Sequence, residues 1–81
     1  MKIRFIQGNF NSKDATDLLI LLIHAKIKFH ESKININCRE NDINMHETAI
    51  RQLQKYLFQA KNLIEKQEEE INIQSEILIN N

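Results

Sequence analysis

Three histidines, one cysteine and eight glutamates are the side chains of this 81-residue sequence best suited to metal binding or catalysis. His24 and His30 are six residues apart, about 240° around a helix, so they cannot share a metal on one unbroken helix. His30 and Cys38 could approach His46 only if two helices meet in an antiparallel hairpin with a short loop. That is the best metal arrangement in the sequence. Solvated side chains at the ends of a loop are the favoured interpretation, so no metal site is predicted.

Nucleophilic catalysis and phosphate binding find even less support in the sequence. Cys38 would need a neighbouring base and a lowered pKa, and a lone cysteine in a loop is usually a free thiol. Gly8 is the only glycine, so a glycine-rich phosphate loop cannot form. The acidic run 68–70 lacks the alternating ligand spacing of a calcium loop. The sequence therefore predicts a protein that is not an enzyme and holds no cofactor.

A basic face on the first helix is the alternative site, and it would bind nucleic acid. Its candidate residues are Lys26, Lys33 and Arg39. Residues 1–39 hold seven basic and three acidic residues, whereas residues 40–81 hold four and eight, so the chain as a whole is neutral. Because binding to phosphates depends on net positive charge, nucleic acid is not expected as the main partner. A small dimeric nucleic-acid-binding regulator remains the alternative function.

Composition excludes several classes of protein. One cysteine cannot form an internal disulfide, which argues against a disulfide-stabilised secreted domain. The longest apolar run, residues 18–23, is far shorter than the roughly 20 residues of a membrane span, and the first residues lack a secretory apolar core. We therefore expect one domain over residues 1–81, located in the cytoplasm, with no membrane partner.

The two ends of the chain have the alternation of β-strands. In residues 2–7, Ile3 and Phe5 share one side, and Ile6 breaks the alternation by falling on the polar side. Gly8 and Asn9 then indicate a turn. Residues 71–79 alternate strictly, with isoleucines on one side and polar residues on the other.

The middle of the chain has helical periodicity. One helix is expected from Asn11 or Ser12 to Ile34, and a second from Asp42 or Asn44 until the acidic run 68–70 weakens it. The first helix has two apolar stripes, which together cover more than half its circumference. The first stripe is Ala15, Leu18, Leu19, Leu22, Ala25 and Phe29. The second stripe is Ile20, Ile23, Ile27 and Ile34.

These elements predict an α+β domain in the order strand, helix, helix, strand. A short loop makes the helices an antiparallel hairpin, which packs on an antiparallel pair of strands. Lys2 and Arg4 would then face Glu76 across the strands. A two-stranded sheet is marginally stable in water and leaves two open edges, so the fold is expected to be completed by dimerisation.

Self-association therefore leads to the functional prediction. The candidate oligomer interface consists of Ile6, Ile20, Ile23, Ile27 and Leu78. We expect a small non-enzymatic interaction or structural module that acts as a homodimer and can also bind another protein. Two dimer geometries are open, one through the edges of the strands and one through the faces of the helices.

Overall fold

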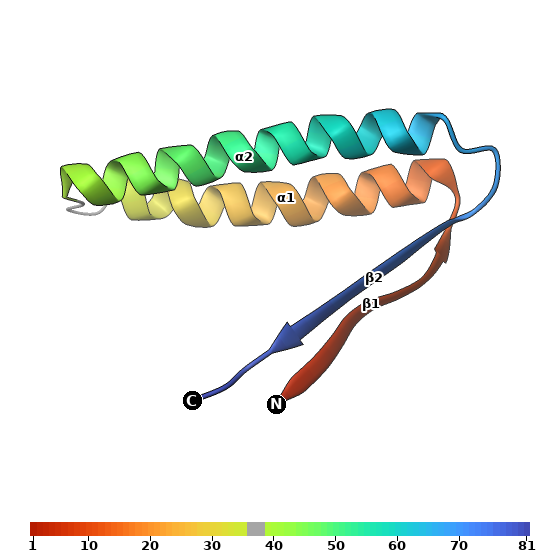
Figure 1. Cartoon of the computed structure of the whole chain (residues 1–81), viewed down its shortest axis with the longest axis horizontal. Helices are drawn as coiled ribbons and strands as arrows, with labels where there is room; N and C mark the ends of the chain where they lie inside the picture. The colour runs from red at the N-terminus through yellow and green to blue at the C-terminus, as the bar shows by residue number, and fades with distance from the viewer. Residues whose placement is uncertain (36–38) are drawn as a thin grey trace.

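A computed structural model describes residues 1–35 and 39–81, which form two strands and two helices. In chain order these elements are β1 (Lys2–Phe10), α1 (Ser12–Ile34), α2 (Glu40–Glu65) and β2 (Ile71–Leu78). The helices form an antiparallel hairpin, and the strands form a two-stranded antiparallel sheet that packs against it (Figure 1). The predicted α+β class and element order are confirmed. Below, α1 and α2 are called the hairpin, and β1 and β2 are called the ribbon.

Helix α1 begins and ends where the sequence predicts. Asn11 is its N-cap, and the Asn11 side-chain oxygen accepts a hydrogen bond from the Asp14 backbone N–H at 2.8 Å. Asp14 lies in the first turn and Lys33 in the last, so each charge complements the helix dipole.

Helix α2 begins at Glu40, earlier than the predicted start at Asp42 or Asn44. Its N-cap is Arg39, whose side chain makes no capping hydrogen bond. Glu40 and Asp42 both lie in the first turn, where negative charge is favoured by the dipole, and this offsets the missing cap. The helix ends at Glu65, before the acidic run 68–70, as expected.

Strand β1 is longer than predicted and contains a bulge. Gly8 and Asn9 do not form a turn, because both pair with β2, Gly8 opposite Ile73. Arg4 pairs with Glu76 and Ile6 with Ser75, which leaves Phe5 as an extra residue between two successive pairs. Because one extra residue reverses the alternation of sides, Ile6 shares the side of Ile3. The prediction that Ile6 lies on the polar side is therefore wrong.

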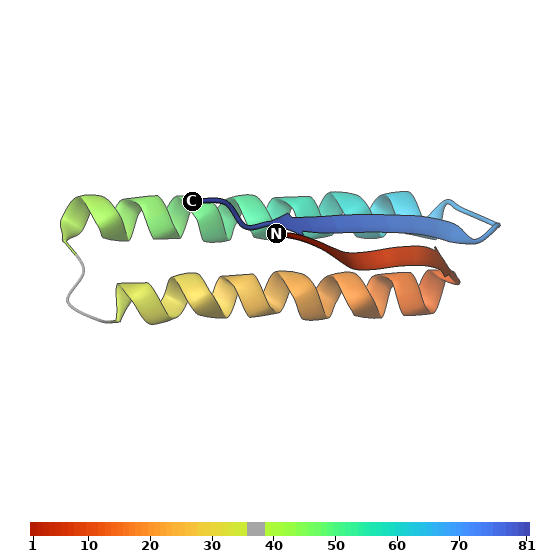
Figure 2. The same ribbon diagram turned by 90° about the horizontal axis from the view of Figure 1, so that it is seen from below.

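The hairpin and the ribbon meet at one end of the molecule and diverge toward the other. Figure 1 shows this as a V, with the ends of the chain at the tip of the ribbon. Viewed from below, the ribbon runs along the hairpin between the two helices (Figure 2). The buried apolar residues among those described are Ala15 and Ile64, which lie near the first turn of α1 and the last turn of α2. The small core thus lies where the two arms join.

Candidate interaction surface

One face of the ribbon is apolar along its length and is half-buried over most of it. Antiparallel pairing places Ile3 opposite Ile77 and Phe10 opposite Ile71, with residues two apart on the same face. This apolar ribbon face consists of Ile3, Ile6, Gly8, Phe10, Ile71, Ile73, Ser75 and Ile77. It is turned toward the hairpin, which is the other layer formed by residues 1–35 and 39–81.

The other face of the ribbon is polar. On it lie Lys2, Arg4, Gln7, Asn9, Asn72, Gln74 and Glu76, together with the apolar Leu78. The Lys2 Nζ lies 3.6 Å from a Glu76 carboxylate oxygen, which confirms the predicted cross-strand ion pair. Arg4 is the register partner of Glu76, but its guanidinium donates to the Gln7 side chain at 3.2 Å.

The hairpin also has an apolar face turned toward the ribbon. On α2, Leu63 lines a small cavity together with Ile71 of the ribbon, which fixes the side of the helix that faces the strands. Tyr56 lies seven residues earlier, about two turns back on the same side. On α1, the fully buried Ala15 is followed at the same helical spacing by Leu22. We define the inner stripe by these positions and their neighbours: Leu18, Leu22 and Phe29 of α1, and Met45, Tyr56 and Leu63 of α2.

Much of the inner stripe is open to solvent even though it faces the ribbon. Leu63 is 63% exposed and Met45 is 59% exposed, and Phe29 and Tyr56 are exposed as well. Across the V, Ile77 on the apolar ribbon face is 40% exposed. Large apolar side chains at such exposure show that the two arms do not cover one another along their length.

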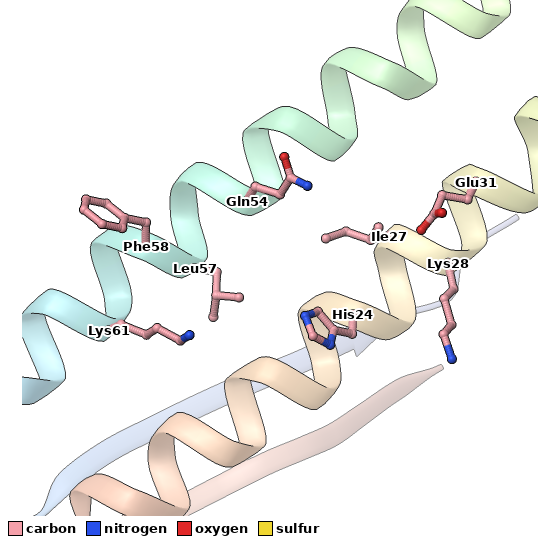
Figure 3. A pocket seen from close by; sticks show the side chains of 8 residues that line it. All are labelled: His24, Ile27, Lys28, Glu31, Gln54, Leu57, Phe58 and Lys61. Carbon is pink, nitrogen blue, oxygen red and sulfur yellow. The ribbon is translucent and has the colours of Figure 1, made fainter.

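A groove lies between the helices on the side of the hairpin away from the ribbon. Figure 3 shows it with the strands behind the helices. Its volume is about 420 Å³. Ile27 and Leu57 extend from the two helices into the space between them and form its apolar base, and Phe58 lies at the rim, where its ring points outward from α2 and is 68% exposed (Figure 3). Polar side chains complete the lining: His24, Lys28, Glu31, Gln54 and Lys61.

The residues predicted as an oligomer interface do not all gather on one surface. Ile20, Ile23 and Ile27 are half-buried, on the side of α1 that turns toward α2. Ile6 lies on the apolar ribbon face, and Leu78 lies on the polar one at 63% exposure. The second stripe of α1 is therefore largely accounted for by the hairpin itself, and its role in an oligomer stays a prediction.

Phe58 is a surface residue that the sequence analysis missed. It follows Leu57 directly, so it falls outside the apolar stripe of α2 that packs on α1. A large aromatic side chain on the polar side of an amphipathic helix is the sequence signal that could have identified it as an exposed apolar residue.

The hairpin brings His30 and His46 into contact near its loop end. Their Nδ1 atoms lie 2.9 Å apart, and both side chains are half-buried. One Nδ1 must donate and the other accept, so the pair needs at least one neutral ring. The His30 Nε2 is buried and has no hydrogen-bond partner among the described residues. The sequence analysis considered that His30 and Cys38 could approach His46, and the structure places His30 there. Cys38 lies outside the described residues.

Burial lowers the pKa of His30, and the nearby His46 and Lys26 lower that pKa further. The neutral ring is thus the favoured form of His30. Within residues 1–35 and 39–81, no cluster of three or more His, Asp or Glu side chains could hold a metal ion. The pair on its own offers two nitrogen ligands.

The candidate basic face is split between the two helices. Lys26 and Lys33 lie on the same side of α1, about 20° apart, whereas Arg39 is the N-cap of α2. The Lys33 Nζ lies 5.5 Å from the centre of the Phe29 ring, a cation–π distance that links this lysine to the inner stripe. The face is exposed, and binding of nucleic acid to it stays a prediction.

Comparisons with known proteins identify no relative of this chain. No protein-family model matches it, and no curated protein or solved structure is similar enough to match. Among the residues described, no helix combines the length and apolar character that crossing a membrane requires.

Proposed function

We propose that this chain is a non-enzymatic interaction module that acts as a homo-oligomer in the cytoplasm. The observation that carries the proposal is the exposure of apolar side chains on both inner faces of the V. Large apolar side chains gathered on exposed faces are typical of surfaces that bind another chain. Binding of an additional protein through the same surfaces is part of the proposal.

The size of the exposed surface supports this proposal. The chain has an accessible surface of 6723 Å². A compact monomer of 9.6 kDa is expected to expose about 5,100 Å², so roughly 1,600 Å² is in excess. The radius of gyration, 15.2 Å, likewise exceeds the value of about 12 Å expected for a compact domain of this length. An open chain of this kind gains stability by covering its apolar faces.

The mass in solution tests this proposal. Light scattering coupled to size exclusion, from low to high micromolar concentration, is expected to give a multiple of 9.6 kDa. A mass of 9.6 kDa throughout that range would contradict the homo-oligomer. A gel-shift assay with mixed DNA and RNA tests the alternative function, a nucleic-acid-binding regulator. It is run at low salt, because electrostatic binding to phosphates is strongest under that condition. Retardation that Lys26→Glu and Lys33→Glu abolish would favour the nucleic-acid regulator instead.

A further inference from the structure

The space inside the V requires an occupant that is apolar on two sides. One wall of this space is the inner stripe of the hairpin, and the other is the apolar ribbon face. Figure 1 shows the two walls diverging from their junction, so a layer inserted between them would touch both. An occupant with a side that lacks an apolar centre would press charged groups onto the middle of one wall, at a cost in desolvation.

The ribbon of a second copy does not meet this requirement. Its second face carries Lys2, Arg4 and Glu76, and the Lys2–Glu76 ion pair lies in solvent on that face. Inserted into the V, such a ribbon would turn its polar face toward the inner stripe or toward the other ribbon.

The hairpin of a second copy has an apolar centre on both of its sides, with charged groups around the one in the groove. One side of the hairpin is the inner stripe, and the opposite side holds the groove with Ile27 and Leu57 at its base and Phe58 at its rim. The charged and polar groups of the groove surround this apolar base, as polar rims surround the apolar centres of protein interfaces.

We propose that the hairpin of a second copy occupies the V. The inner stripes of the two hairpins then pack against each other, and each ribbon covers the groove on the far side of its partner's hairpin. A two-fold axis makes the two contacts identical, so each copy fills the V of the other and the assembly closes at two chains. This inference rests on the proposed function and specifies its partner and contact geometry.

The dimensions and areas fit this arrangement. The nine residues of β1 extend about 30 Å and the 23 residues of α1 about 35 Å, so a ribbon is long enough to lie along most of a hairpin. Two copies that each cover their excess surface would bury about 3,200 Å², which falls in the range of obligate homodimers. The neutral net charge of the chain adds no overall repulsion between copies.

The test compares three charged variants by light scattering, with circular dichroism as a check on folding. Tyr56→Glu charges the inner stripe, Ile77→Glu the apolar ribbon face, and Phe58→Glu the groove. All three side chains are at least 40% exposed in the single chain, so the substitutions leave its fold in place. Each is expected to raise the dissociation constant of the dimer more than about 100-fold, because a symmetric dimer buries the charge twice.

Two matched controls lie next to the tested surfaces. Leu78→Glu alters the polar face of the same ribbon, and Leu21→Glu alters a side chain of α1 that is 69% exposed and lies on neither surface. Both variants are expected to stay dimeric.

Phe58→Glu separates this inference from the proposed function. A wild-type dimer that Phe58→Glu leaves intact would overturn the interlocked arrangement while leaving the homo-oligomer standing. Wild-type protein of 9.6 kDa would overturn both. Dissociation of the Leu78→Glu or Leu21→Glu variant, with the helix content retained, would also count against the assignment of the surfaces.

Discussion

His30 on α1 and His46 on α2 face each other near the loop end of the hairpin, with their Nδ1 atoms 2.9 Å apart. The contact joins the two helices, whereas the other side-chain hydrogen bonds described for α1 and α2 each lie within one helix. It also makes the protonation of one side chain matter for the packing of both helices, because two imidazolium rings cannot hydrogen bond to each other.

Stability is expected to fall in mildly acidic solution because of this pair. Burial lowers the pKa of His30 in the folded state below its ordinary value of 6.5. Between the pKa of His30 in the folded state and its pKa in the unfolded chain, the unfolded chain binds more protons than the folded one. The free energy of unfolding therefore rises with pH over that range, and the contribution of His30 reaches its full size above about pH 6.5. Urea titrations at fixed protein concentration from pH 5 to 8 measure this slope.

The matched variants for this pH dependence are His30→Gln and His24→Gln. His30→Gln removes the shifted group and is expected to flatten the slope. At protein concentrations low enough to keep the chain monomeric, His24 is exposed in the open groove, so His24→Gln should retain the wild-type slope there. An unchanged slope in His30→Gln would assign the pH dependence to other groups.

The bulge in β1 predicts different outcomes for two neighbouring substitutions. Ile6→Lys places a charge on the half-buried apolar ribbon face and is expected to lower the free energy of unfolding by about 1–2 kcal/mol. Gln7→Lys alters the exposed polar face and should change it by less than about 0.5 kcal/mol. Denaturant unfolding of both variants makes the comparison, and equal effects would argue for a regular strand without the bulge.

The N-caps of the two helices differ, so substitutions at these two positions should change the stability in opposite directions. Asn11→Ala removes the hydrogen bond to the Asp14 N–H and should destabilise the fold by about 1 kcal/mol. Arg39→Ser supplies α2 with the side-chain cap that it lacks and should stabilise the fold by up to about 1 kcal/mol. Thermal unfolding midpoints that shift in the same direction would contradict this account of the caps.

The junction of the two arms has no room for a larger side chain at Ala15. Ala15 is 0% exposed, so Ala15→Leu overpacks the small core and should cost about 1–3 kcal/mol. Ala25 lies on the same helix but is exposed, and Ala25→Leu should stay within about 0.5 kcal/mol of the wild type. Denaturant unfolding distinguishes the two, and tolerance of leucine at both positions would place the core elsewhere.

The sequence predicted the elements that local signals determine. The N-cap at Asn11, the end of α1 at Ile34 and the strand from Ile71 follow from capping residues and periodicity, and the structure has them there. The ion pair of Lys2 with Glu76 also followed, because it needs only two amphipathic strands in antiparallel order.

The features that the sequence did not predict depend on residues far apart in the chain. The bulge at Phe5 arises from pairing with residues about 70 positions away. The break in alternation at Ile6 was its local trace, but that break alone does not specify which residue is left out of the ladder. Gly8 resembled a turn residue by type, yet its partner Ile73 keeps it in the strand. The angle of the V and the exposure of the inner stripe depend on how the layers meet, which periodicity alone does not define.

The pairing of β1 with β2 also determines the order in which the chain can assemble. The ribbon joins the two ends of the sequence, from Phe10 with Ile71 to Lys2 with Leu78, so its formation must close a loop that includes both helices. The hairpin needs a much shorter closure and can form first, because the entropy lost grows with the length of the loop. Among the hydrogen-bonded amides, those of the strands are therefore expected to exchange with deuterated solvent before those of the helices, and the ribbon is expected to form last and to open first.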